Sequence, residues 1–280
     1  MIKSILTCTD GSAYSETAAH YAVDLASSLR ARLAGLHVLD SRLLEGPFLA
    51  NVSGWIGAQP CADSLGQFRA LMQENGKAML AALADQASRK DIDLEPLEDW
   101  GHPARIILQR EIHTELVVLG LRGEHADLNP ELVGSTTDRV VRHSTQPCLL
   151  TPASHRPIRR LMAAYDDSAY SARALQVAID LALSLQAPLV ILSVVENGDH
   201  ELAMDHADAA MKLARAHECA AAYMVAEGNV HEVILEQAEA LNCDLIIAGA
   251  HGHARIRELI LGSTATYLMN HTERPLLLAR

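Results

Sequence analysis

Two stretches of the chain combine glycines with hydroxyl side chains at a spacing that suits phosphate binding. In the second half, Gly249, Gly252 and Gly262 precede Ser263 and Thr264 in the run GAHGHARIRELILGST, which we call the second glycine loop. Glycine lets the backbone pass close to a ligand or adopt a positive φ, because it has no Cβ. Ser263 and Thr264 open an expected helix, whose first amides are unpaired and carry partial positive charge. The pattern therefore predicts an anion site for phosphates that needs no large basic patch.

The same pattern recurs in the first half, as the first glycine loop. Its members are Gly120, Gly123, Gly134, Ser135 and Thr136. Here ten residues separate the second and third glycines, whereas nine separate them in the second half. An N-cap role for the serine is the ordinary alternative in either half. The repetition favours a shared ligand.

The charges between the glycines differ between the halves. The first loop holds three carboxylates beside Arg122, at Glu124, Asp127 and Glu131. The second loop instead combines one carboxylate with basic and imidazole side chains, at Glu258, Arg255, Arg257, His251 and His253. A misplaced charge a few ångströms from a phosphate costs a few kcal/mol, or about two decades in affinity. We therefore expect the second half to bind the anion and the first to bind weakly or not at all.

Catalytic and metal-binding patterns are much weaker than the phosphate pattern. Neither loop contains the lysine of a G-x4-G-K-[ST] motif, and no G-x-S-x-G motif occurs. His251 and His253 have no third ligand at a suitable spacing, so no zinc site is expected. Asp166 and Asp167 could supply oxygen ligands to Mg²⁺, although an aspartate after a strand is more often a turn former. We therefore assign no catalytic and no resident metal-binding residue.

The segments that position these loops form an internal sequence repeat. Residues 2–40 align without a gap on residues 158–196, and Asp10 falls on Asp166 and Val38 on Val194. Two later segments, including both glycine loops, repeat in the same order. We place one domain at residues 1–152 and a second at 156–280, joined by the Pro-flanked segment PASHRPIRR.

Each half alternates short apolar strands with amphipathic helical stretches. In the second half the expected strands are RRLMAAY, LVILSVV, AAYMVAEG, DLIIAGA and PLLLA. Between the first two, residues 171–185 place an alanine and leucine stripe on one helical face. Strand and helix in alternation predict an α/β fold with an open parallel sheet covered by helices on both faces. Ligands of such sheets bind beyond the carboxyl ends of the strands, where both glycine loops fall.

Composition narrows the cellular role. The 280 residues carry a formal net charge of −12, which argues against non-specific binding to nucleic acid or to an anionic membrane. No apolar run approaches the roughly 20 residues that span a bilayer, and the N-terminus is unlike a signal peptide. The five cysteines form no C-x-x-C pair, so we expect reduced thiols and a cytoplasmic protein.

These residues resemble the universal stress protein family in a tandem form. The family pattern G-x2-G-x9-G-[ST] is matched by the second glycine loop, and Asp10-Gly11-Ser12 is similar to the family's first strand end. The resemblance covers both halves and implies two five-stranded parallel sheets of order 3-2-1-4-5. For the nucleotide-binding branch it implies ATP, optionally with Mg²⁺. The implied contacts in the second half are Asp166, Val194, Gly249, Gly252, Gly262, Ser263 and Thr264, and the weaker ones in the first are Asp10, Val38, Gly120, Gly123, Gly134, Ser135 and Thr136.

Three functions remain open at this point. The first is an ATP-binding stress-response or signalling protein with an unidentified protein partner, and the second is a slow ATPase. The third is a nucleotide-free interaction module that uses residues 41–75, expected to form a long loop before a helix that ends near Lys90. Burial against the sheet is the alternative for that loop's apolar side chains, which are Leu43, Leu44, Phe48, Leu49, Trp55 and Ile56.

The resemblance also bears on assembly. Family members pair through their last strands, which here are QPCLLT and RPLLLA. These two strands could pair within one chain and form a pseudo-dimeric monomer, and a homodimer is the alternative.

Overall fold

The computed structural model describes residues 2–45, 62–124, 126, 132–195, 198, 200–251 and 261–280. Its first half contains the strands β1 (Ser4–Thr9), β2 (Arg32–Asp40), β3 (Leu94–Gly101), β4 (Leu116–Gly120) and β5 (Cys148–Thr151). The strands of the second half are β6 (Leu161–Ala164), β7 (Leu189–Val195), β8 (Ala221–Glu227), β9 (Leu245–Gly249) and β10 (Leu276–Ala279). All five strands expected in the second half are present at these positions.

Within the described residues, the ten strands form one continuous sheet of order β3-β2-β1-β4-β5-β10-β9-β6-β7-β8. Each half keeps the order 3-2-1-4-5, and its own strands are parallel. The two five-stranded sheets are joined into one, because β5 and β10 pair antiparallel at the centre, with Leu149 opposite Leu277. Both last strands are fully buried leucine-rich segments, so pairing them hides two apolar edges that would otherwise meet water.

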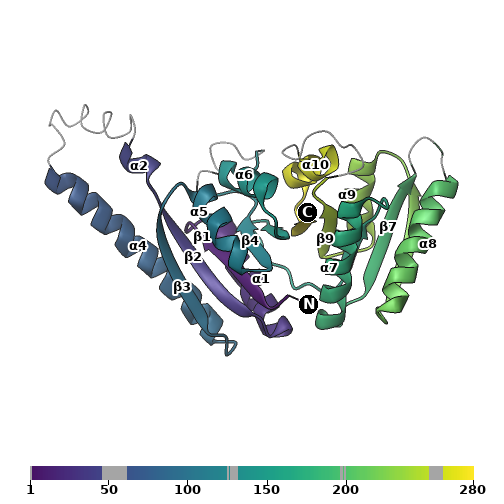
Figure 1. The fold of residues 1–280 in the computed structure, drawn as a ribbon, viewed down its shortest axis with the longest axis horizontal. Helices are drawn as coiled ribbons and strands as arrows, with labels where there is room; N and C mark the ends of the chain where they lie inside the picture. The colour runs from purple at the N-terminus through teal and green to yellow at the C-terminus, as the bar shows by residue number, and fades with distance from the viewer. Residues whose placement is uncertain are drawn as a thin grey trace.

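Helices cover both faces of the sheet, as Figure 1 shows. One face packs against α1 (Ala13–Leu29), α4 (Ala62–Ser88), α7 (Ala169–Leu185) and α8 (His200–Ala216). The other packs against α5 (Pro103–Arg110), α6 (Ser135–His143), α9 (Val230–Ala240) and α10 (Ser263–His271). A 3₁₀ turn, η1 (Glu111–His113), follows α5. Each apolar layer runs through both halves, so the two repeats share their cores.

The two helices that follow the first strand of each half start and stop alike. The hydroxyls of Ser12 and Ser168 cap α1 and α7 by accepting hydrogen bonds from the amides three residues later. Both helices end on a left-handed residue, Arg30 or Gln186. The predicted alanine and leucine stripe of α7 faces the core.

The junction between the halves has polar contacts as well as paired strands. The Arg280 guanidinium donates to the carbonyl of Arg142 at 3.0 Å, and the Thr17 hydroxyl donates to the carbonyl of Ala153 in the connecting segment at 3.0 Å. The amide of Arg156 donates to the Tyr21 hydroxyl at 2.9 Å. These bonds hold the connecting segment against α1.

The insertion of the first half is more helical than expected. Residues 62–75, expected as loop, lie in α4, and Arg42–Glu45 form the short helix α2. Residues 46–61 lie outside the described residues. So do the apolar side chains of Leu44, Phe48, Leu49, Trp55 and Ile56, whereas Leu43 is described and exposed. In Figure 1, α4 runs along β3 and extends past the end of the sheet.

Two further features concern cysteines and membranes. Cys8, Cys148, Cys219 and Cys243 are unpaired thiols, and burial raises the pKa of Cys148 to about 12. Among the helices that the structure describes, none is both long and apolar enough to cross a bilayer.

Candidate functional site

The expected ligand residues of the second half meet at the carboxyl edge of the sheet. β6, which precedes Asp166, lies between β7 and β9, so the ends of these three strands are neighbours. Gly249 ends β9, and the amide of Gly262 donates to the Ala250 carbonyl at 2.9 Å. This bond brings the start of α10 next to the end of β9. Val194 lies half-buried near the end of β7.

The start of α10 is not capped by a side chain. Gly262 occupies the N-cap position with φ −59° and ψ 148°, and Ser263 is the first helical residue. Ser263 is therefore not an N-cap, which removes the ordinary alternative for its hydroxyl. It is exposed, and Thr264 is half-buried. The amides of an uncapped first turn point to solvent and can donate to an anion.

Gly249 is required for packing within the chain. A Cβ at this residue would lie 2.9 Å from the Cβ of Tyr170 and 3.0 Å from the amide nitrogen of Ser171, both in the first turn of α7. Gly249 also does not adopt a positive φ. The positive φ expected as one option was therefore wrong, and α7 fills the space where a side chain would be; the ligand contact of Gly249 stays a prediction.

The turn after β6 fixes Asp166 beside α7. Its Oδ1 accepts a hydrogen bond from the amide of Ser168 at 3.0 Å. The next residue, Asp167, has a positive φ of 61°, and its Oδ1 accepts from the Tyr165 hydroxyl at 2.7 Å. Burial and this carboxylate raise the pKa of Tyr165. Each of the two carboxylates thus accepts a hydrogen bond from a nearby residue.

The corresponding aspartate of the first half is bound by its own loop. The amide and hydroxyl of Ser12 donate to Asp10 Oδ1 at 3.0 and 2.6 Å, and the amide of Glu124 donates to Oδ2 at 3.2 Å. A Cβ on Gly123 would lie 2.7 Å from the same Oδ2. The absence of a side chain at Gly123 thus leaves room for the Asp10 carboxylate.

The long helix α4 covers the neighbouring turn in the first half. The Met79 side chain lies so near Gly11 that a Cβ there would be 2.7 Å from its Cε. Gly11 has a positive φ of 80° and corresponds to Asp167, which carries a side chain. One turn earlier, Gly76 packs against the His37 ring. Helix α4 therefore packs against the turn after β1, while Asp10 itself stays exposed.

The helix start in the first half resembles that in the second but has basic neighbours. Gly134 caps α6 without a side-chain bond, and Gly120 touches Tyr14 as Gly249 touches Tyr170. A hollow of about 60 Å³ beside Ser135 and Thr136 is also lined by Arg42, His102 and Arg139. Sequence comparison missed these three residues, since they come from segments outside the glycine loop. Arg42 is already paired with Asp40.

Several residues used in the sequence argument lie outside the described residues. They are Gly252, His253, Arg255, Arg257 and Glu258 in the second half, and Asp127 and Glu131 in the first. Arg122 is described, and its guanidinium stacks over the Tyr14 ring 5.7 Å from the centroid. In the part of the chain that is described, no group of three or more His, Cys, Asp or Glu side chains is placed to hold a metal ion.

Comparison with known proteins identifies relatives across the whole chain. The sequence model of the universal stress protein family matches residues 1–152 and again residues 157–280. A universal stress protein of Synechocystis sp. is 29% identical over 287 residues, which cover 100% of both chains. A putative universal stress protein of Staphylococcus haemolyticus is 27% identical over 150 residues, which cover 52% of this chain and 81% of that protein.

A solved structure shares the tandem fold. The crystal structure of a universal stress protein from Archaeoglobus fulgidus superimposes with a TM-score of 0.77 at 21% identity. The superposition covers 99% of this chain and 98% of the other, so the likeness includes both halves.

Proposed function

The chain belongs to the universal stress protein family, and we propose that its second half binds ATP in a cytoplasmic stress-response or signalling role. In this proposal the amides at the start of α10, with Ser263 and Thr264, hold the phosphates. Asp166 and Val194, at the ends of neighbouring strands, contact the adenosine. The bound nucleotide is then sensed by a protein partner.

The observation that carries the proposal is the uncapped start of α10. The chain caps α1 and α7 with serine hydroxyls, whereas α6 starts at Gly134 without a side-chain bond. At α10 it places Gly262 at the N-cap and leaves Ser263 exposed instead. A helix start without a side-chain acceptor has unsatisfied donors and positive dipole charge, which suit a polyphosphate. The residues present therefore fit the group.

We further propose that the first half binds ATP weakly. Both aspartates accept from the amide of the serine two residues later, and Asp10 also accepts from the Ser12 hydroxyl and the Glu124 amide, which compete with a nucleoside for its oxygens. Met79 from α4 occupies the adjacent space. The arginines beside Ser135 act in the opposite direction by attracting anions, but Arg42 is neutralised by Asp40. The balance favours the second half.

The test uses matched substitutions in the intact chain, because the shared sheet argues against separating the halves. The backbone of Gly262, at φ −59°, accepts any side chain, so Gly262→Val should fold while its methyl groups crowd the helix amides. Gly134→Val makes the same change at α6, where the nearest atom to a Cβ is 3.4 Å away.

We expect ATP to co-purify with the wild-type protein and with Gly134→Val, as detected by mass spectrometry, and to be lost from Gly262→Val. Calorimetric titration of nucleotide-free protein should then show at least tenfold weaker binding for Gly262→Val alone. No ATP binding by the wild type, or selective loss in Gly134→Val, would contradict the proposal.

A further inference from the structure

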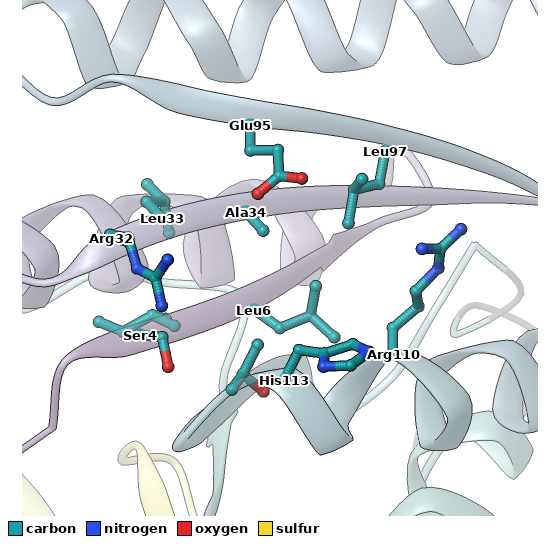
Figure 2. A pocket seen from close by; sticks show the side chains of 11 residues that line it. Ser4, Leu6, Arg32, Leu33, Ala34, Glu95, Leu97, Arg110 and His113 are labelled. Atoms are coloured by element: carbon teal, nitrogen blue, oxygen red, sulfur yellow. The ribbon is translucent and has the colours of Figure 1, made fainter.

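A hollow of about 360 Å³ lies at the opposite edge of the sheet from the glycine loops. It opens at the amino ends of β1, β2 and β3, on the face that α5 and α6 cover. Leu6, Ala34 and Leu97 form an apolar floor that belongs to the core of that face. His113 and Thr114, which follow α5, form the opposite wall. Figure 2 shows these side chains around the open space.

The hollow follows from small side chains that the second half replaces with larger ones. Ser4 and Ala34 correspond to Arg160 and Val190 in the gapless repeat. The Arg160 guanidinium reaches across and donates to the carbonyl of Leu241 at 2.6 Å. The covering helix also differs in length, since α5 has 8 residues and α9 has 11. The second half thus shows the same region of the fold without the small side chains that line the hollow in the first half.

Charged side chains of opposite sign border the hollow on adjacent strands. Arg32 on β2 and Glu95 on β3 are near neighbours, because Glu95 is opposite Ala34 in the register. Neither side chain forms a hydrogen bond or ion pair with any residue that the structure describes, whereas Arg110 is paired in a bidentate manner with Asp99. The repeat has Pro188 and Ala222 at the positions of Arg32 and Glu95.

A serine hydroxyl also faces this space. Ser4 is only 8% exposed and lines the hollow, and its hydroxyl has no partner within the described part of the chain. In Figure 2 it lies beside Arg32. The Ser4 hydroxyl can therefore donate to a ligand oxygen in the hollow. The hollow therefore offers two adjacent donors, one carboxylate and an apolar floor.

We propose that this hollow binds an α-amino acid with an apolar side chain. Arg32 and the Ser4 hydroxyl receive the carboxylate, Glu95 receives the ammonium group, and the side chain lies on Leu6 and Ala34. Binding sites for small molecules begin at about 300 Å³ and combine apolar lining with a few placed polar groups, as here. A zwitterion matches the unpaired charges of both signs, whereas a simple anion would leave Glu95 repelling it. This site is independent of nucleotide binding.

The test compares three probes that differ by one charged group each. L-leucine carries both groups, 4-methylpentanoate lacks the ammonium group, and 3-methylbutylamine lacks the carboxylate. Titrations of the full-length protein are followed by heteronuclear NMR. We expect L-leucine or L-phenylalanine to bind with a dissociation constant below about 1 mM, and both truncated probes to bind at least tenfold more weakly than L-leucine, as loss of a charged hydrogen bond implies.

Two variants assign each charge. Arg32→Gln should weaken the binding of L-leucine and 4-methylpentanoate about tenfold or more and leave that of 3-methylbutylamine unchanged. Glu95→Gln should weaken the binding of L-leucine and 3-methylbutylamine by a similar factor and leave that of 4-methylpentanoate unchanged. Arg89→Gln and Glu273→Gln, at exposed sites elsewhere, should leave all three unchanged. Circular dichroism confirms the fold of each variant. The proposal is overturned if neither amino acid binds below about 1 mM, if 4-methylpentanoate binds as tightly as L-leucine, or if neither charge variant changes binding.

Discussion

A negative charge at the start of α10 should have opposite effects on the free protein and on nucleotide binding. Ser263→Asp places a carboxylate at the first helical position, where it interacts favourably with the helix dipole. This interaction stabilises the free protein by about 0.3–1 kcal/mol. The same carboxylate would repel a phosphate held by the helix amides. The substitution therefore separates a binding defect from a folding defect.

The size of the repulsion follows from distance and exposure. A carboxylate about 5 Å from a phosphate charge is unfavourable by about 3 kcal/mol at an effective dielectric constant near 20, and by about 0.8 kcal/mol in water. Because Ser263 is exposed, we expect about 1–2 kcal/mol, or a five- to thirtyfold loss of ATP affinity. Ser135→Asp makes the same change at α6 and should alter ATP affinity little.

The assay is calorimetric titration with ATP at low and high salt, together with thermal unfolding without nucleotide. Ser263→Asp should raise the melting temperature of the free protein by about 1–4 °C. Its binding defect should shrink at high salt, because ions screen exposed charges. Unchanged affinity in Ser263→Asp, or an equal loss in Ser135→Asp, would show that α10 does not hold the phosphates.

Three other predictions test the packing and the titrating groups. Gly249→Ala should lower the free energy of unfolding, measured in urea, by about 1–3 kcal/mol, because the new methyl group would collide with α7. Gly66→Ala, in open space on α4, should raise the free energy of unfolding by about 0.5–1 kcal/mol. Equal effects of the two substitutions would contradict the packing argument. Burial raises the pKa of Cys148 to about 12, so peptide mapping should find its alkylation at pH near 8 about a thousandfold slower than that of a free cysteine, and rapid labelling of the folded protein would contradict this. Burial lowers the pKa of His155 despite its ion pair with Asp24, so its contribution to stability is present above about pH 6.5 and is lost as the pH falls below that value. The melting temperature should accordingly fall more in the wild type than in His155→Gln between about pH 7.5 and 5.5, and parallel curves would refute the assignment.

The strands and most helices could be predicted because their signals are local. The apolar runs of β7 and β10 and the serine caps of α1 and α7 depend on neighbours in the sequence. The repeat also predicted that Asp166 and Gly249 would meet at one edge, since parallel strands end together. Pairing of the last strands within one chain was foreseen as one option, and the sheet adopts it.

The rest depends on contacts between distant segments, which no local pattern specifies. A glycine at position 249 is compatible with either a ligand or a helix beside it, and the sequence alone does not show that α7 packs there. The bond from Glu124 to Asp10 joins residues 114 positions apart, and the aspartate's residue type does not reveal it. The hollow beside Ser4 could have been suspected by asking where one repeat has small side chains and the other large ones.

The antiparallel contact between β5 and β10 has a consequence for how the two repeats could change over time. In a dimer of identical chains every substitution appears at both sites, and the pairing weakens as the protein is diluted. Joining the copies in one polypeptide removes both constraints. One repeat could acquire a helix of 27 residues where the other has one of 17, with their ratio fixed at one to one.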